Sequence, residues 1–168
     1  MKRLLLHPLV ARLAALAVGL VFVYASHDKI WKRAGPDPKT GEVTALSGPA
    51  EFARVVYRYQ IVGPSDRLPP VVPNVFAVTL PWIELVAGLL LILGVWRREA
   101  ALLCAAMLAM FIVSVGSALW RGIDLKNCGC FSVSGEGRAA GLGLIVGDTA
   151  LLAASLLAAR RRPQETRP

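Results

Sequence analysis

The stretch Val75–Val95, VFAVTLPWIELVAGLLLILGV, decides the fold, because Glu84 is its only ionisable residue. Its length matches the roughly 20 residues that an α-helix needs to cross the hydrocarbon core of a bilayer. The chain contains further apolar blocks of this kind: Leu13–Ala25, Ala100–Leu119 and Ala139–Ala159. The first of these is shorter, but it extends back to Leu9 when Arg12 snorkels to the interface. Each block therefore predicts a membrane-spanning helix.

The composition of the whole chain agrees with a membrane protein. Of its 168 residues, 55% are hydrophobic and 18% are charged, whereas a soluble domain carries fewer apolar and more charged residues. We predict an all-α integral membrane protein, a four-transmembrane-helix antiparallel bundle that forms a single domain over residues 1–168. Its helices are expected at about 9–26, 75–96, 100–119 and 139–159.

The basic residues set the expected orientation. The formal net charge is +8, but no nucleic-acid-binding motif accompanies it, so nucleic acid is not an expected partner. Basic residues instead lie close to the ends of the apolar blocks, in both tails and in the WRRE turn after the second block. The positive-inside rule assigns such a side to the cytoplasm. We predict a multi-pass protein of the bacterial inner membrane, surrounded by lipid, with both termini cytoplasmic.

A signal peptide is the alternative for the N-terminus. The segment MKRLLLHPLVARLAALAVGLVFVYAS has a basic start, an apolar middle and the residues VYA before a cleavage point after Ala25. We favour an uncleaved helix, because the apolar run with its flanks is long for a signal peptide. Cleavage would leave three spans without changing the side of the later loops.

The polar segment 27–74, expected outside the membrane, contains a short amphipathic pattern. Apolar and aromatic residues recur at helical spacing on one face, namely Phe52, Val55, Val56 and Tyr59. Arg54 and Arg58 fall on the opposite face, and Pro49 suits a first helical turn. We predict a short outer amphipathic helix that lies on the membrane surface or across the mouth of the bundle.

Two carboxylates, Glu84 and Asp148, lie near the middle of predicted spans. An ionised carboxylate there costs about 2.5–3.5 kcal/mol on insertion scales, so each must face the bundle interior, be protonated or pair. Candidate partners nearer the outer ends are Arg138, His27 and Lys29. One interpretation is intramembrane proton handling or ligand binding. The other is that each carboxyl bonds a neighbouring helix or a backbone group freed beside Pro81, where a kink is expected.

The last apolar block contains Gly143 and Gly147. This spacing of small residues lets another helix approach closely. The same spacing also occurs by chance in glycine-rich apolar helices, so the pair is weak evidence for a helix contact.

The sharpest chemical signal is Cys128 and Cys130 in the stretch LKNCGCFSVSG, within the predicted outer loop 120–138. In an oxidising compartment the pair can close a disulfide. The small ring of this disulfide forces an unfavourable geometry, which the flexible backbone of Gly129 makes easier to adopt. A strained disulfide exchanges readily with other thiols. This favours a redox-active pair. The alternatives are a static staple, unreactive loop cysteines, or ligands of a metal site, although the loop offers no histidine. Cys104, early in the third block, is expected to be a small buried hydrophobe.

Several segments resemble known membrane families. LPWIELVAGLLLILGVWRREAA (80–101) resembles the second helix of the DoxX-like superfamily. NCGCFS followed by GDTALLAAS resembles the MauE branch, the methylamine utilisation membrane proteins, in which a CGCFG-type loop precedes the last helix. Here Ser132 replaces the usual glycine. SHDKIWK and FARVVYRYQI are also similar to that branch.

The resemblance implies work in redox chemistry or protein maturation. MauE-like proteins are implicated in maturing methylamine dehydrogenase, whose small subunit is exported and densely disulfide-bonded. The leading expectation is therefore a membrane accessory protein whose Cys128–Cys130 pair exchanges thiols with an exported cysteine-rich partner. DoxX-like relatives include subunits that pass electrons to quinone, so one alternative is an oxidoreductase subunit that uses quinone together with Glu84 and Asp148. The other alternative is a non-catalytic anchor of a complex.

Overall fold

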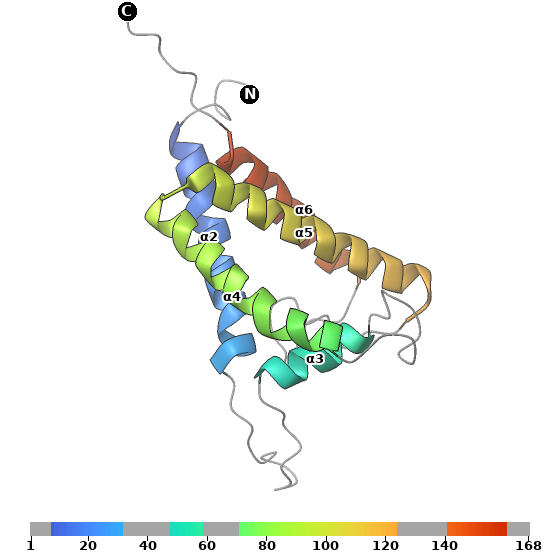
Figure 1. Ribbon diagram of the computed structural model, residues 1–168. Coiled ribbons are helices and arrows are strands. Elements are labelled where there is room, and N and C mark those ends of the chain that lie inside the picture. Colours follow the sequence, from blue (N-terminus) through green and yellow to red (C-terminus); the bar gives the residue numbers. More distant parts are fainter. Residues whose placement is uncertain (1–7, 32–47, 59–70, 124–140, 161–168) are drawn as a thin grey trace, which may run out of the picture.

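The computed structural model describes residues 8–31, 48–58, 71–123 and 141–160 (Figure 1). Within these ranges all regular structure is helical, as predicted. In chain order the helices are α2 (Pro8–Trp31), α3 (Gly48–Arg58), α4 (Val71–Leu93), α5 (Arg97–Trp120) and α6 (Leu142–Ala158).

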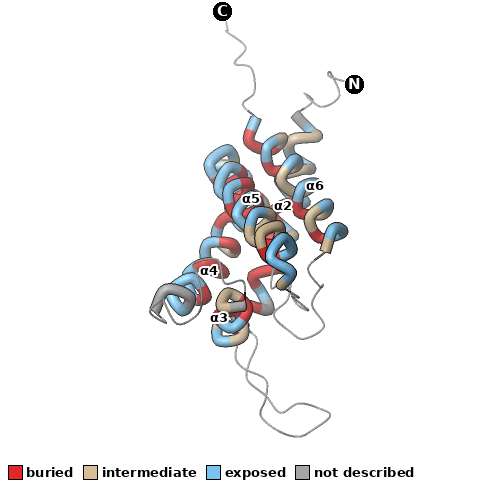
Figure 2. The backbone as a smooth tube through the Cα atoms, turned by 90° about the vertical axis from the view of Figure 1, so that its right-hand side faces the viewer, coloured by how far each residue is buried: buried red, intermediate tan, exposed pale blue. Residues whose placement is uncertain are grey.

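Three of these helices are long and apolar enough to cross a membrane, over Leu9–Trp31, Asn74–Leu93 and Arg97–Trp120. Helix α6 is apolar too, but its 17 residues make it shorter. Many large apolar residues of the long helices are exposed, as expected of surfaces in contact with lipid. Figure 2 shows exposed residues along α4 and α5 alternating with buried ones. The chain is therefore a membrane protein, and a fourth span formed by α6 stays a prediction.

The observed end of α2 differs from the predicted one. The helix was expected to stop near residue 26, which would leave His27 and Lys29 in the outer segment, but it continues to Trp31. The physical reason is that the Lys29 side chain is fully buried, with 0% exposed, and has a partner inside the bundle. A charged residue therefore does not mark the end of this helix.

The helices pack as antiparallel neighbours, with the most extensive contacts between α2 and α4 and between α5 and α6. Helices α2 and α4 come into close contact at Gly19 and Gly88, where a Cβ on either glycine would lie 2.8 Å from the carbonyl oxygen of the other. A Cβ at Gly143 or Gly147 would meet nothing within 4 Å among the described residues. The glycine contact that joins two helices is thus in α2 and α4, and the contact expected for the α6 pair is not found in this part of the chain.

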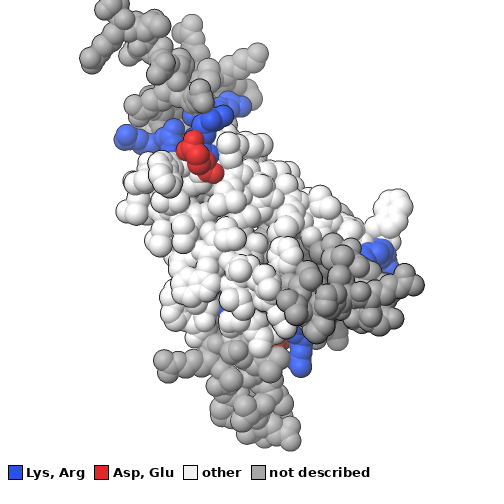
Figure 3. Space-filling model, viewed as in Figure 1, with Lys and Arg blue, Asp and Glu red and all other residues white. Residues whose placement is uncertain are grey.

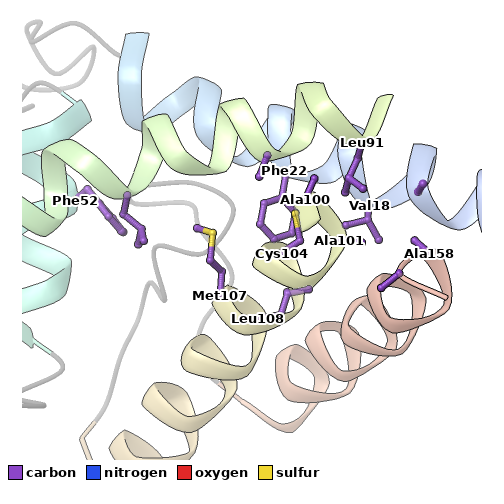
Figure 4. Packing of buried hydrophobic residues seen from close by; sticks show 14 of the residues in the cluster. Val18, Phe22, Phe52, Leu91, Ala100, Ala101, Cys104, Met107, Leu108 and Ala158 are labelled. Atoms are coloured by element: carbon purple, nitrogen blue, oxygen red, sulfur yellow. The ribbon is translucent and has the colours of Figure 1, made fainter. Parts of the chain in front are cut away.

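The core is built mainly from small and medium apolar residues that allow this close packing (Figure 4). Cys104 lies among them with 0% of its surface exposed, as expected of a small buried hydrophobe. Around it are Val18 and Phe22 of α2, Leu91 of α4 and Leu108 of α5.

The bundle has two distinct ends. At the end that we call the turn end, α2 begins, α4 passes into α5 through residues 94–96, and α6 finishes. At the opposite end, the loop end, α5 finishes, α6 begins and α3 packs against α2 and α4. The buried face of α3 carries Phe52, Ala53 and Val55, and Arg54 is exposed, which confirms the amphipathic helix.

Candidate functional site

A buried ion pair joins α2 to α4 near the loop end. Lys29 Nζ lies 2.8 Å from both Oε1 and Oε2 of Glu84, and the two side chains are 0% and 2% exposed. One ammonium group therefore donates to both oxygens of one carboxylate. Lys29, one of the three candidate partners considered for the interior acids, therefore pairs with Glu84.

The helix geometry explains why these two side chains meet. Side chains on an α-helix lean toward its N-terminus. Because α2 and α4 are antiparallel, Lys29 leans back along the bundle while Glu84 leans toward the loop end. The same alignment brings the rings of Trp31 and Trp82 to a centroid distance of 6.2 Å.

Two aromatic rings lie close to the ammonium group. Lys29 Nζ lies 4.9 Å from the ring centroid of Phe52 in α3 and 5.5 Å from that of Phe111 in α5. Cations are attracted to ring faces within about 6 Å, most strongly where water is excluded. Lys29 therefore contacts side chains from α3, α4 and α5 and connects α3 to the spanning helices.

Asp148, the second predicted interior acid, is also buried, with 2% of its surface exposed on α6. It lines the same small cavity as Glu84, together with apolar residues that include Phe22 and Phe111. This cavity of about 20 Å³ has room for about one water molecule. The structure thus brings the two predicted acids to one cavity, although they lie on different helices.

The structure does not describe the predicted cysteine pair. Cys128 and Cys130 lie outside the described residues, as does Arg138. The residues that flank the loop are described: α5 is followed by Ile123, and α6 is preceded by Gly141. The loop therefore leaves and re-enters the bundle at the loop end, the end that holds the Lys29–Glu84 pair.

The position of Lys29 inside the bundle is what the sequence reasoning missed. A signal was available, because Lys29 continues the spacing of the buried residues Val18, Phe22 and Ala25 along one face of α2. A lysine in register with an apolar stripe, opposite a glutamate in a neighbouring span, indicates an interior pair. The aromatic contacts had no such signal, since α3 and α5 are far from α2 in the sequence.

Comparisons with known proteins were consistent with one another. The profile of the family described as methylamine utilisation protein MauE matches residues 7–161. The chain is also similar to methylamine utilization protein MauE of Methylophilus methylotrophus, at 29% identity over 130 residues. That match covers 77% of this chain but 57% of the relative, so the chain spans little more than half of the relative's length. No solved structure matches the chain.

Proposed function

Because the chain belongs to the family of methylamine utilisation protein MauE, we propose that it is a membrane accessory protein that assists the maturation of an exported, cysteine-rich partner. The proposed chemistry is thiol–disulfide exchange at Cys128 and Cys130, on the extracytoplasmic side of the inner membrane. An oxidising compartment on that side would let the pair persist as a disulfide.

The observation that carries this proposal is the packing at both ends of the cysteine loop. Ile123 packs against a buried cluster formed by α3, α5 and α6, whose members are Val55, Val115, Ala118 and Leu144. Leu144 lies one turn after the loop rejoins the bundle. Phe111 packs against this cluster and its ring also faces Lys29. The residues at both ends of the loop therefore pack against one buried cluster, which contacts the Lys29–Glu84 pair through Phe111. Fixed loop ends of this kind suit a loop that has to bind a partner.

The proposed transfer of the disulfide to the partner needs no other reactive group in this protein. A thiolate of the partner attacks one sulfur of the Cys128–Cys130 disulfide, forms a mixed disulfide and releases the other cysteine as a thiolate. A second partner thiolate then attacks the mixed disulfide, which leaves the partner oxidised and the Cys128–Cys130 pair as a dithiol. A membrane quinone is the class of oxidant that would restore the disulfide, taking up the two electrons and two protons.

For Glu84 the geometry supports a positioning role more than quinone binding. The carboxylate is engaged by Lys29 through both oxygens, and the cavity that it shares with Asp148 is about 20 Å³, the size of about one water molecule. A quinone ring needs far more room. We propose that Lys29 and Glu84 hold α2, α3 and α4 in place beneath the loop.

Trapping of the mixed disulfide tests the proposal. In Cys128→Ser or Cys130→Ser the pair cannot close, so the remaining loop thiolate reacts by the reverse exchange: it attacks a disulfide of the partner, forms a mixed disulfide and releases one partner thiolate. The second loop cysteine that would resolve this mixed disulfide is missing, so one of the single variants should accumulate a reducible covalent adduct with an exported protein. The double variant should form none. Cys104→Ser is the control, because Cys104 is buried in the core. If neither single variant forms an adduct while the partner matures normally, the loop does not exchange thiols.

The proposed side of the loop has its own test. A membrane-impermeant thiol reagent added to intact spheroplasts should label reduced Cys128 and Cys130 but leave buried Cys104 unlabelled. Labelling of the loop pair only after lysis would place the loop in the cytoplasm and overturn the proposal.

A further inference from the structure

The turn end carries a basic pocket that the proposed thiol exchange does not use. A cavity of about 660 Å³ opens there between α2, the α4–α5 turn and the end of α6. Arginines from three parts of the chain line it, namely Arg12, Arg97, Arg98 and Arg160. Figure 3 shows Lys and Arg gathered at this end, above a broad belt of uncharged residues.

Although Glu99 follows Arg97 and Arg98 in the first turn of α5 and Figure 3 shows an acidic residue at this end, none of these guanidinium groups forms an ion pair within the described part of the chain. The ion pairs found there are Lys29 with Glu84 and Arg54 with Glu51, and neither involves the pocket. Three of the pocket arginines are exposed and Arg97 is half-buried. Because like charges held close together repel each other, an anion bound from outside would stabilise this arrangement.

The rest of the pocket is apolar. Its walls include Leu16 of α2 together with Leu91, Ile92 and Leu93 of α4. Leu16 is 40% exposed and Leu93 is 72% exposed, so the wall continues onto the outward-facing surface of spanning helices. A pocket with cationic groups and an apolar wall of this kind matches an amphiphile that has an anionic head and hydrocarbon chains.

We propose that this pocket binds the phosphodiester headgroup of an anionic phospholipid. Arginine forms paired hydrogen bonds with phosphate oxygens, and basic pockets between spanning helices are known to hold anionic headgroups. The acyl chains would cover Leu16 and Leu93. Free phosphate could satisfy the arginines but would leave this apolar wall bare, so the wall favours the lipid as the source of the phosphate.

Native mass spectrometry of the full-length protein in non-ionic detergent tests the proposal. The probes are phosphatidylglycerol and phosphatidylcholine with identical acyl chains. The wild type should bind phosphatidylglycerol in preference. Arg97→Gln should weaken that binding about fivefold, and Arg97→Gln with Arg98→Gln about thirtyfold, at the strength expected of a basic residue near an anionic surface. Binding of phosphatidylcholine should not change.

Arg54→Gln is the matched control, because Arg54 is an exposed arginine on α3 at the opposite end. An equal loss in this variant would mean diffuse surface charge and overturn the proposal, as would an unchanged lipid preference in the double variant. Inorganic phosphate that binds as tightly as phosphatidylglycerol would overturn the choice of a lipid. Arg97→Lys with Arg98→Lys retains the charge, so it should keep most of the preference if the glutamine variants fold poorly.

Discussion

The two ends of the bundle treat charge in opposite ways. At the loop end one lysine is completely buried, bonded to both oxygens of Glu84 and flanked by two aromatic rings. At the turn end the arginines of the basic pocket have no ion-pair partner among the described residues, and most are exposed. The charge at the loop end is buried, so the fold itself must neutralise it. The charges at the turn end remain available to a partner from outside the chain.

This contrast has an energetic consequence. Removing one member of a buried pair leaves an uncompensated charge away from water, which is costly. Removing an exposed, unpaired charge takes away no native contact, so its effect on stability is small. Substitutions at the loop end should therefore lower the stability of the protein much more than substitutions at the turn end. Those at the turn end should instead weaken anion binding.

The largest expected effect comes from Glu84→Leu, which leaves Lys29 buried without its partner. We expect the free energy of unfolding to fall by about 3–5 kcal/mol, measured by denaturant titration of the purified protein in detergent micelles. Glu51→Gln is the control, because Glu51 faces Arg54 at 4.0 Å in a partly exposed pair. Such pairs contribute about 0–1 kcal/mol. Equal stability losses in the two variants would show that burial of the Lys29–Glu84 pair has no special cost.

The next effect is expected at the glycine contact that aligns α2 with α4. In Gly88→Ala the new Cβ would lie 2.8 Å from the backbone oxygen of Gly19. Overpacking costs about 1–3 kcal/mol, which exceeds the gain of about 0.5–1 kcal/mol from replacing a helical glycine by alanine. The variant should therefore unfold at a lower temperature than the wild type.

Gly147→Ala provides the matched control, since its Cβ would meet nothing within 4 Å among the residues that the structure describes. It should raise stability by about 0.5–1 kcal/mol. A loss of stability in this variant, similar to that of Gly88→Ala, would mean that the α2–α4 contact is not what makes Gly88 sensitive.

A smaller effect on stability is expected when both members of the buried pair are replaced together. Lys29→Met with Glu84→Met removes both charges and keeps similar volume, and such exchanges are often neutral or stabilising. Methionine sulfur also contacts aromatic rings favourably, which suits the site beside Phe52 and Phe111. We expect a stability within about 1 kcal/mol of the wild type. The activity of this variant then separates the two roles: retained activity supports positioning, and lost activity in a stable protein supports proton handling.

Much of the fold could be predicted from local patterns in the sequence. The apolar blocks indicate the spanning helices, and the spacing of Phe52 and Val55 opposite Arg54 indicates the amphipathic helix, because both patterns depend on neighbours within a few turns. The presence of Glu84 and Asp148 inside apolar blocks likewise predicts that each faces the bundle interior, is protonated or is paired, since an ionised acid facing lipid is costly. The structure confirms their burial.

What could not be predicted depends on how helices distant in the sequence align. Gly19 and Gly88 form the close contact, whereas Gly143 and Gly147 have the better-known spacing but no neighbour within 4 Å among the described residues. The choice between these pairs is made by the tertiary arrangement and not by either helix alone. For the same reason, the pairing of Lys29 with Glu84 was one of several candidates, and the Phe111 contact had no local signal.

The smallest expected effect on stability is that of Arg97→Gln at the turn end. Arg97 is half-buried but has no ion-pair partner in the described part of the chain, and a substitution away from any such contact changes stability by about 0.5 kcal/mol or less. The measurement is the free energy of unfolding in non-ionic detergent without added lipid, beside Glu84→Leu under the same conditions. When phosphatidylglycerol is added, the wild type should gain more stability than Arg97→Gln, because a ligand stabilises the folded state by an amount that grows with the logarithm of its affinity. A large loss of stability in the lipid-free Arg97 variant would mean that its guanidinium has a structural partner, and the distinction between the two ends would fail.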